Sequence, residues 1–204
     1  MGRHDISLGH ALASKGLAAG LYATTRVQTA FGWQSLASLA PGDLVLTRDG
    51  GLMPVDLIAQ DNRAALWSVR LPAHALANDT TLMLPPGQSV LIETPMAVPF
   101  TGEPAALIPA TALEGWRGIA PHVPAQTAPI LRLIFASEVL VSPSPGIWTL
   151  AEAARRVFEL HHLLDVPRRA VLPLPLARQL VANLIAEEAG RGLTQAALRP
   201  ENRA

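Results

Sequence analysis

The stretch Thr24–Ile58, TTRVQTAFGWQSLASLAPGDLVLTRDGGLMPVDLI, decides the fold prediction for this chain. Short apolar runs alternate here with residues that favour turns. Phe31-Gly32 and Asp49-Gly50-Gly51 are turn signatures, and Pro41-Gly42-Asp43 precedes the apolar run Leu44–Thr47. The stretch therefore predicts several short antiparallel strands joined by tight turns.

The same alternation continues to about residue 148. The predicted strands are Arg26–Thr29, Leu44–Thr47, Leu52–Ile58, Leu66–Leu71, Thr81–Leu84, Ser89–Glu93, Ala106–Pro109, Ile130–Phe135 and Val139–Ser142. Breakers such as Pro85-Pro86-Gly87, interpreted as a hairpin turn, separate most of them. The pattern indicates an all-β unit, and therefore a mainly β fold for this part of the chain.

The periodicity changes after Trp148. Thr149-Leu-Ala-Glu152 matches a capping box, and apolar residues then recur at helical spacing as far as Leu164. A second helix is predicted from Pro175, with Gly190 as its C-terminal cap. We therefore predict an N-terminal arm over 1–22, a β domain over 23–148 and a C-terminal helical pair over 149–204, which makes the fold α+β overall.

Composition excludes several classes of function. Half of the 204 residues are hydrophobic, 16% are charged and the formal net charge is zero, so a clustered basic surface for nucleic acid is not expected. The chain has no cysteine, which excludes disulfides, thiolate metal sites and a cysteine nucleophile. No apolar run is long enough to span a bilayer, and the first residues lack the apolar core of a secretory signal. These features predict no membrane partner and favour a cytoplasmic location.

Four landmarks in order resemble the Hint (hedgehog/intein) family, specifically its bacterial Hint-2 branch. They are Gly20-Leu-Tyr-Ala-Thr-Thr-Arg-Val-Gln-Thr29, Leu39-Ala-Pro-Gly-Asp-Leu-Val-Leu-Thr-Arg-Asp-Gly50-Gly51, Ala106-Leu-Ile-Pro-Ala-Thr-Ala-Leu113 with Gly115 and Ile119, and Glu138-Val-Leu-Val141. The resemblance runs from about Gly20 to Leu150 and implies the curled β fold of self-processing domains.

The resemblance also implies where the reactive groups of such a domain would stand. The nucleophile that attacks the preceding carbonyl corresponds to Gly20, which has no side chain. The hydroxyl and histidine that assist the leaving nitrogen correspond to Pro85 and Gln88, and a further histidine corresponds to Ser137. An amide such as that of Gln88 does not titrate near neutral pH. We therefore predict a degenerate, non-enzymatic Hint domain that serves as a structural or protein-interaction module.

An alternative remains open at this stage. Thr24 and Thr25 carry hydroxyls near the start of the domain, and His74 lies upstream of the position expected for the histidine. A domain that uses one of these hydroxyls would be a divergent autoproteolytic enzyme. Separately, the apolar faces of the C-terminal helices predict a surface for a protein partner or for a second copy of the chain.

Other candidate groups favour structural roles. His161 and His162 point about 100° apart on a helix, and with Asp165 they make a weak metal site, so no metal or cofactor is predicted. His4 and His10 lack a third partner. Asp43 and Asp49 lie in turn signatures where a carboxylate accepts from local backbone amides. Trp116, between glycines, is the aromatic residue predicted to be an exposed contact.

Overall fold

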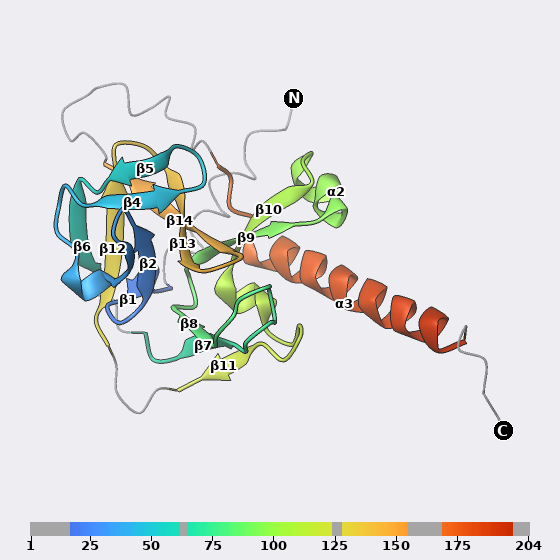
Figure 1. Ribbon diagram of the computed structural model, residues 1–204. Coiled ribbons are helices and arrows are strands. Elements are labelled where there is room, and N and C mark those ends of the chain that lie inside the picture. The colour runs from blue at the N-terminus through green and yellow to red at the C-terminus, as the bar shows by residue number, and fades with distance from the viewer. Residues whose placement is uncertain (1–16, 62–64, 124–127, 155–168, 198–204) are drawn as a thin grey trace.

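The computed structural model describes residues 17–61, 65–123, 128–154 and 169–197. Two β-sheets and one long C-terminal helix make up this part of the chain (Figure 1). The larger sheet has 11 strands, and its main path runs β1-β12-β14-β13-β4-β2-β3, with β5, β6, β9 and β10 attached. The smaller sheet has three strands in the order β11-β7-β8. The predicted mainly β fold with C-terminal helix is confirmed.

The elements are short, as the spacing of turn residues requires. The strands of the larger sheet are β1 (Leu21–Tyr22), β2 (Arg26–Thr29), β3 (Gly32–Ser35), β4 (Leu44–Thr47), β5 (Gly51–Pro54), β6 (Leu57–Asp61), β9 (Ser89–Glu93), β10 (Ala105–Pro109), β12 (Ile130–Phe135), β13 (Val139–Ser144) and β14 (Ile147–Ala153). Those of the smaller sheet are β7 (Ser68–Leu71), β8 (Leu82–Leu84) and β11 (Ala120–His122). The helices are η1 (Leu36–Ser38), η2 (Pro95–Ala97), α2 (Val98–Thr101), η3 (Ala110–Leu113) and α3 (Leu174–Ala197).

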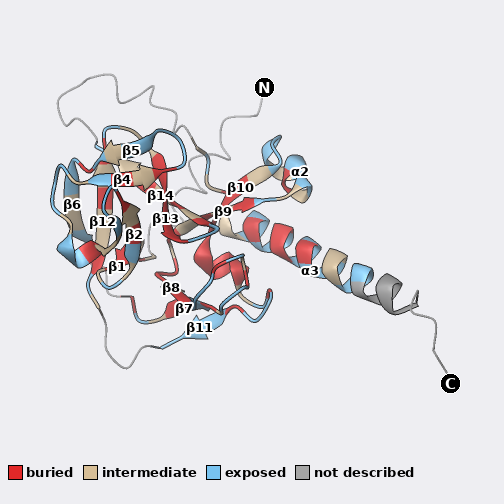
Figure 2. Cartoon of the chain, in the orientation of Figure 1, coloured by how far each residue is buried: buried red, intermediate tan, exposed pale blue. Residues whose placement is uncertain are grey.

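The core lies between the curled sheets, and alternate strand residues reach it (Figure 2). Val27, Val45 and Phe135 are completely buried, while their neighbours along each strand are half-buried or exposed. Full burial of such side chains stabilises the fold by about 1.5–3 kcal/mol each. The alternation of apolar and polar residues in the sequence is therefore the pattern of a sheet with one solvent-exposed face.

The helix α3 is attached by an apolar stripe and by one polar cluster. Ala177, Leu180, Val181 and Leu184 lie on the buried side of the helix, which contacts η2, β10 and η3. Further along, Glu188 accepts hydrogen bonds from Arg117 and from the indole nitrogen of Trp116, at 2.9 Å and 3.0 Å.

These contacts favour the ionised form of the Glu188 side chain. The hydrogen bond from Arg117 lowers the pKa of the Glu188 carboxyl below its ordinary value of 4.5; burial opposes this effect, and the bond from Trp116 adds to it. The carboxylate is therefore the favoured form at neutral pH, where it joins α3 to the loop that follows η3. Trp116 is 5% exposed, so the prediction of an exposed aromatic contact at this position is wrong.

Several sequence predictions need correction. Leu52–Ile58 is two strands, because the chain changes partner at Val55: β5 pairs with β4 and β6 pairs with β12. Pro85-Pro86-Gly87 is a turn but not a hairpin, since β8 pairs with β7 whereas β9 pairs with β10 and β14. Strands β1, β3, β11 and β14 were not predicted.

The C-terminal prediction is confirmed for one helix. Thr149 and Glu152, the ends of the expected capping box, lie in strand β14, so the predicted domain boundary at Trp148 falls inside a strand. The remainder of the first predicted helix, residues 155–168 with His161, His162 and Asp165, lies outside the described residues, as do His4 and His10. Gly190 does not end the second helix, which continues to Ala197. Likewise, the end of the predicted arm forms strand β1.

Among the helices in the described part of the chain, none combines the length and the apolar character needed to cross a membrane.

Candidate functional site

The site lies where the chain enters the larger sheet. Gly87 of the Pro85–Gln88 turn donates its backbone N–H to the carbonyl of Ala18, at 2.9 Å. The next residue, Ala19, donates its N–H to Asp61 Oδ2 at 3.2 Å. The peptide bond between Ala18 and Ala19, one residue before the bond that precedes Gly20, is therefore held from both sides beside this turn.

Gln88 connects the next peptide bond, between Ala19 and Gly20, to the sheet. Its Oε1 accepts the backbone N–H of Gly20 at 2.7 Å, and its Nε2 donates to the carbonyl of Leu150 in β14 at 2.9 Å. Gln88 is 3% exposed, and both ends of its side-chain amide are satisfied. Gln88 can orient the backbone of Gly20, but a carboxamide supplies no group that exchanges a proton near neutral pH.

Gly20 is packed too closely for any side chain. A Cβ atom added to it would lie 2.6 Å from the carbonyl oxygen of Leu131 and 2.9 Å from Ile130 Cγ2, both in β12. The φ angle of Gly20 is +122°, in a region that residues other than glycine rarely adopt. The antiparallel register Leu21↔Leu131 brings β12 this close. A Ser, Thr or Cys at this position would therefore require the backbone to move.

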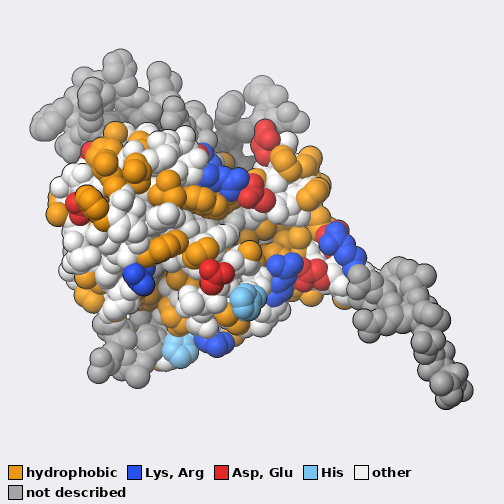
Figure 3. All heavy atoms as spheres, in the orientation of Figure 1, with side chains coloured by type: hydrophobic (Ala, Val, Ile, Leu, Met, Phe, Trp, Pro, Cys, Tyr) orange, Lys and Arg blue, Asp and Glu red, His pale blue; other side chains and the backbone are white. Residues whose placement is uncertain are grey.

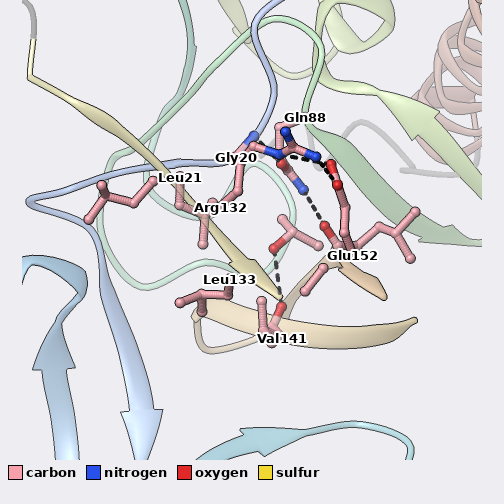
Figure 4. A pocket seen from close by; sticks show the side chains of 11 residues that line it. Gly20, Leu21, Gln88, Arg132, Leu133, Val141 and Glu152 are labelled. Atoms are coloured by element: carbon pink, nitrogen blue, oxygen red, sulfur yellow. Dashed lines mark hydrogen bonds and ion pairs between the residues drawn. The ribbon is translucent and has the colours of Figure 1, made fainter. Parts of the chain in front are cut away.

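A small cavity opens beside Gly20 and Gln88, and Figure 4 shows the side chains around it. Arg132 and Glu152 form an ion pair across the parallel strands β12 and β14, with one bond of 3.0 Å between Arg132 Nε and Glu152 Oε1. Thr149 carries the one hydroxyl among the residues that line the cavity, and its Oγ1 donates to the carbonyl of Val141 at 3.2 Å. The cavity thus contains one ion pair and one hydrogen-bonded hydroxyl.

The structure brings some of the predicted site residues together and separates others. Gly20 and Gln88 are in direct contact. Pro85 is buried at the start of the turn and accepts the N–H of Gln88 through its carbonyl, at 3.0 Å. Ser137 lies half-buried between β12 and β13 and does not line the cavity.

The alternative nucleophiles lie elsewhere. Thr24 is exposed in the turn after β1, and Thr25 accepts the N–H of Leu36 through its carbonyl, at 2.9 Å. Neither of them lines the cavity beside Gly20. His74 is exposed in the loop that follows β7, where its N–H donates to the carbonyl of Asn78.

The acidic turn residues have structural partners. Asp43 accepts the N–H of Ala40 at 2.8 Å, as predicted for a turn carboxylate. Asp49 differs from its prediction, because it accepts the N–H of distant Leu140 at 3.0 Å and pairs with Arg169. Within residues 17–61, 65–123, 128–154 and 169–197, no three His, Asp or Glu side chains are grouped so that they could hold a metal ion.

Sequence reasoning did not identify Asp61, Thr149, Arg132 or Glu152 as residues of this site. The last three are neighbours only because β14 is a strand beside β12 and β13, which the helical pattern after Trp148 concealed. Asp61 ends β6, and its bond to Ala19 joins residues 42 positions apart. No local signal predicts such a contact.

The model of the Hint domain family matches residues 19–149, well over half of the chain, and the chain therefore belongs to the Hint domain family. A search of curated proteins found no match.

Two solved inteins are similar in structure. One is a GSH-linked, splice-inactive variant of the AceL NrdHF class 3 split intein, with 12% identity and a TM-score of 0.45 over 67% of this chain and 99% of the intein. The other is the MchDnaB-1 intein, with 14% identity and a TM-score of 0.38 over 65% of this chain and all of the intein.

Proposed function

We propose that this Hint domain does not cleave its own chain and instead acts as a structural or protein-interaction module. The observation that supports the proposal most is the close approach of Leu131 to Gly20, where an added Cβ would lie 2.6 Å from a backbone oxygen. Self-processing begins when a hydroxyl or thiol attacks the preceding carbonyl carbon. At this position the chain has neither the group nor the room for one.

The environment of the leaving nitrogen supports the same proposal. Expulsion of the Gly20 nitrogen requires a group that gives it a proton, and the group in contact with that nitrogen is the Gln88 carboxamide oxygen, which accepts. Gln88 therefore holds the peptide bond without promoting its cleavage. The network from Ala18 to Leu150 is a means of fixing the chain.

Intact mass measurement tests the proposal. The full chain carries a tag at each end and is incubated for days at neutral pH, with and without a small thiol. We expect one unchanged mass. Fragments that separate at any peptide bond from Ala19 to Thr25 would overturn the proposal and establish the divergent self-cleaving enzyme. Thr24→Ala, Thr25→Ala and Thr149→Ala would then identify the hydroxyl, because only replacement of the true nucleophile would abolish the fragments.

The interaction surface that we propose for the module is the outer half of α3. The helix runs on from Glu188, its last anchored side chain described above, to Ala197, and Figure 1 shows it projecting away from both sheets. A protein partner or a second copy bound there would leave the anchored half in place. Light scattering on the full chain and on a chain ending at Arg191, which retains Leu180 and Glu188, tests the second copy. If each chain had the mass expected for its own monomer, self-association through α3 would be contradicted.

A further inference from the structure

Three residues other than glycine have a positive φ angle in the described part of the chain, and they belong to one network of contacts. They are His74 at +66°, Ala77 at +63° and Arg117 at +47°. His74 and Ala77 lie in the loop that joins β7 to β8, and Arg117 lies in the loop after η3. Such backbone strain persists only where surrounding contacts enforce it, and it is concentrated at functional sites and switch regions.

Arg117 joins helix α3 to the β7–β8 loop. Its Nε donates to Glu188 Oε1 at 2.9 Å, and its Nη1 donates to the carbonyl of Ala75 at 3.0 Å. The guanidinium also lies over the ring of Trp116, 4.7 Å from the ring centre. Figure 3 shows charged and histidine side chains close together on this face, where α3 leaves the domain. The position of Arg117 is therefore defined by the helix on one side and by the loop on the other.

The β7–β8 loop is organised around one buried side chain. Asn78 is completely buried, and its Nδ2 donates to the carbonyls of Pro72 and Thr80, both at 2.7 Å. Its Oδ1 accepts the N–H of Leu76 at 3.0 Å. These bonds connect the two ends and the middle of the loop, so the loop changes conformation as a unit.

The left-handed residues determine what this unit can contact. His74 and Ala77 stand on either side of the short piece that carries the Ala75 carbonyl, so their backbone angles set the direction in which that carbonyl points. Ala77 also packs on the turn between β13 and β14, because a Cβ added to Gly146 would lie 2.7 Å from the Ala77 oxygen. In this conformation the loop contacts Arg117 on one side and the β13–β14 turn on the other.

We propose that the last anchored turn of α3 and the β7–β8 loop form one two-state element, in which the docking of Glu188 holds the loop in its strained conformation. When Glu188 leaves, Arg117 loses its fixed position and the loop loses the contact that offsets its strain. The loop then relaxes to ordinary φ angles. The coupling is reciprocal, so that any change that favours the present loop conformation strengthens the docking of α3.

This inference deepens the proposed function and rests on it for the identity of the trigger. A protein partner that binds the outer half of α3 and draws Glu188 away from Arg117 would release the loop, so that binding at one surface changes another. The coupling is tested below without a partner. It can therefore fail while the interaction surface on α3 stands, and light scattering can contradict that surface while the coupling stands.

Amide hydrogen exchange of the full chain, followed residue by residue by NMR, tests the coupling from the helix to the loop. Glu188→Ala is compared with Glu187→Ala, the neighbouring residue, which pairs with Arg191 within α3. Both substitutions introduce the same helix former, so they differ in the contact with Arg117. We expect exchange at the Leu76 amide to become roughly three- to fivefold faster in Glu188→Ala, the factor for a partly exposed ion pair. In Glu187→Ala it should be unchanged.

The opposite direction is tested at the helix. His74→Gly relieves strain at an exposed position, because glycine adopts positive φ about as readily as negative φ. Ala73→Gly is the matched control, since Ala73 is exposed in the same loop and has no positive φ. We expect exchange at the amides of Glu188 and Ala189 to become about twofold slower in His74→Gly. Ala73→Gly should not slow it.

The coupling requires both results together. Unchanged exchange at Leu76 in Glu188→Ala would overturn it, because the loop would then keep its conformation without the helix. A response of the loop to Glu188→Ala with no response of α3 to His74→Gly would overturn it as well, since a coupling free energy acts in both directions. Equal changes in a variant and its control would assign the effect to general flexibility of the helix or the loop, which also contradicts the proposal.

Discussion

The chain enters the domain and leaves it by different kinds of contact. Around Ala18 and Gly20, backbone groups are bonded to the Pro85–Gln88 turn, and β12 packs against the glycine. Along α3 the contacts are made by side chains: apolar residues such as Leu180, and the carboxylate of Glu188. The first region is specified by backbone position and tolerates no added atom. The second is specified by side chains, so its stability should change in graded steps when they are trimmed.

The largest effect is expected for Gly20→Ala. The added methyl group meets the Leu131 oxygen and the backbone has a glycine-type φ, so the free energy of unfolding should fall by about 2–6 kcal/mol. Gly32→Ala is the matched control, because Gly32 has a φ of +92° with no atom within 4 Å of the added Cβ. Urea unfolding of both variants separates steric overlap from backbone strain. Equal losses would show that β12 does not restrict Gly20.

Leu180→Ala tests the other region. Leu180 is completely buried on the packed side of α3, and its truncation should cost about 2–5 kcal/mol. Leu176→Ala is the control, since Leu176 is on the same helix and 40% exposed, and it should cost clearly less. Thermal unfolding followed by circular dichroism measures both. If the two variants were equally stable, the helix would not be packed as described.

Gln88→Leu should have a smaller effect than either. The substitution keeps a similar volume but leaves the Gly20 N–H and the Leu150 carbonyl without their partner, at a cost of about 1–3 kcal/mol. Hydrogen exchange of the Gly20 amide provides a local readout and should become faster. Protection that persisted in the variant would mean that another group satisfies this amide.

The smallest effect is expected for Glu188→Gln, with a characteristic pH dependence. The pKa of Glu188 is lowered in the folded chain, so its contribution is present above its unfolded value near 4.5 and is lost as the pH falls through the folded value. Because both partners are partly exposed, the contribution should be below about 1 kcal/mol. The difference in stability between the original chain and Glu188→Gln should appear at pH 7 and shrink toward pH 3. A constant difference would rule out this carboxylate as its source.

Local signals predicted the parts of the fold that local chemistry determines. Ile130–Phe135 was predicted with its correct bounds, and the hairpin at Asp49-Gly50-Gly51 joins Thr47 to Gly51 as the turn residues require. The contact between the start of the domain and the Pro85–Gln88 turn followed from the family resemblance. For these segments, turn residues and alternation agree with the final partners.

Other parts could not be predicted because distant partners override local preference. Thr149 and Glu152 have the spacing of a helix cap, but Thr149 donates to Val141 and Glu152 pairs with Arg132. Strand pairing on both sides of β14 stabilises this segment more than the first turn of a helix would. Trp116 is similar, since glycines around it suggested an exposed loop, whereas α3 covers it. No alternation in the sequence records which segment will lie on top of another.

The bonds at Ala18, Ala19 and Gly20 have a mechanical consequence. A force applied to the polypeptide before Leu17 is not absorbed by a loose hinge but passes directly to β12, through the two residue pairs of β1. The backbone from Ala18 to Gly20 is therefore attached to the domain in a fixed direction.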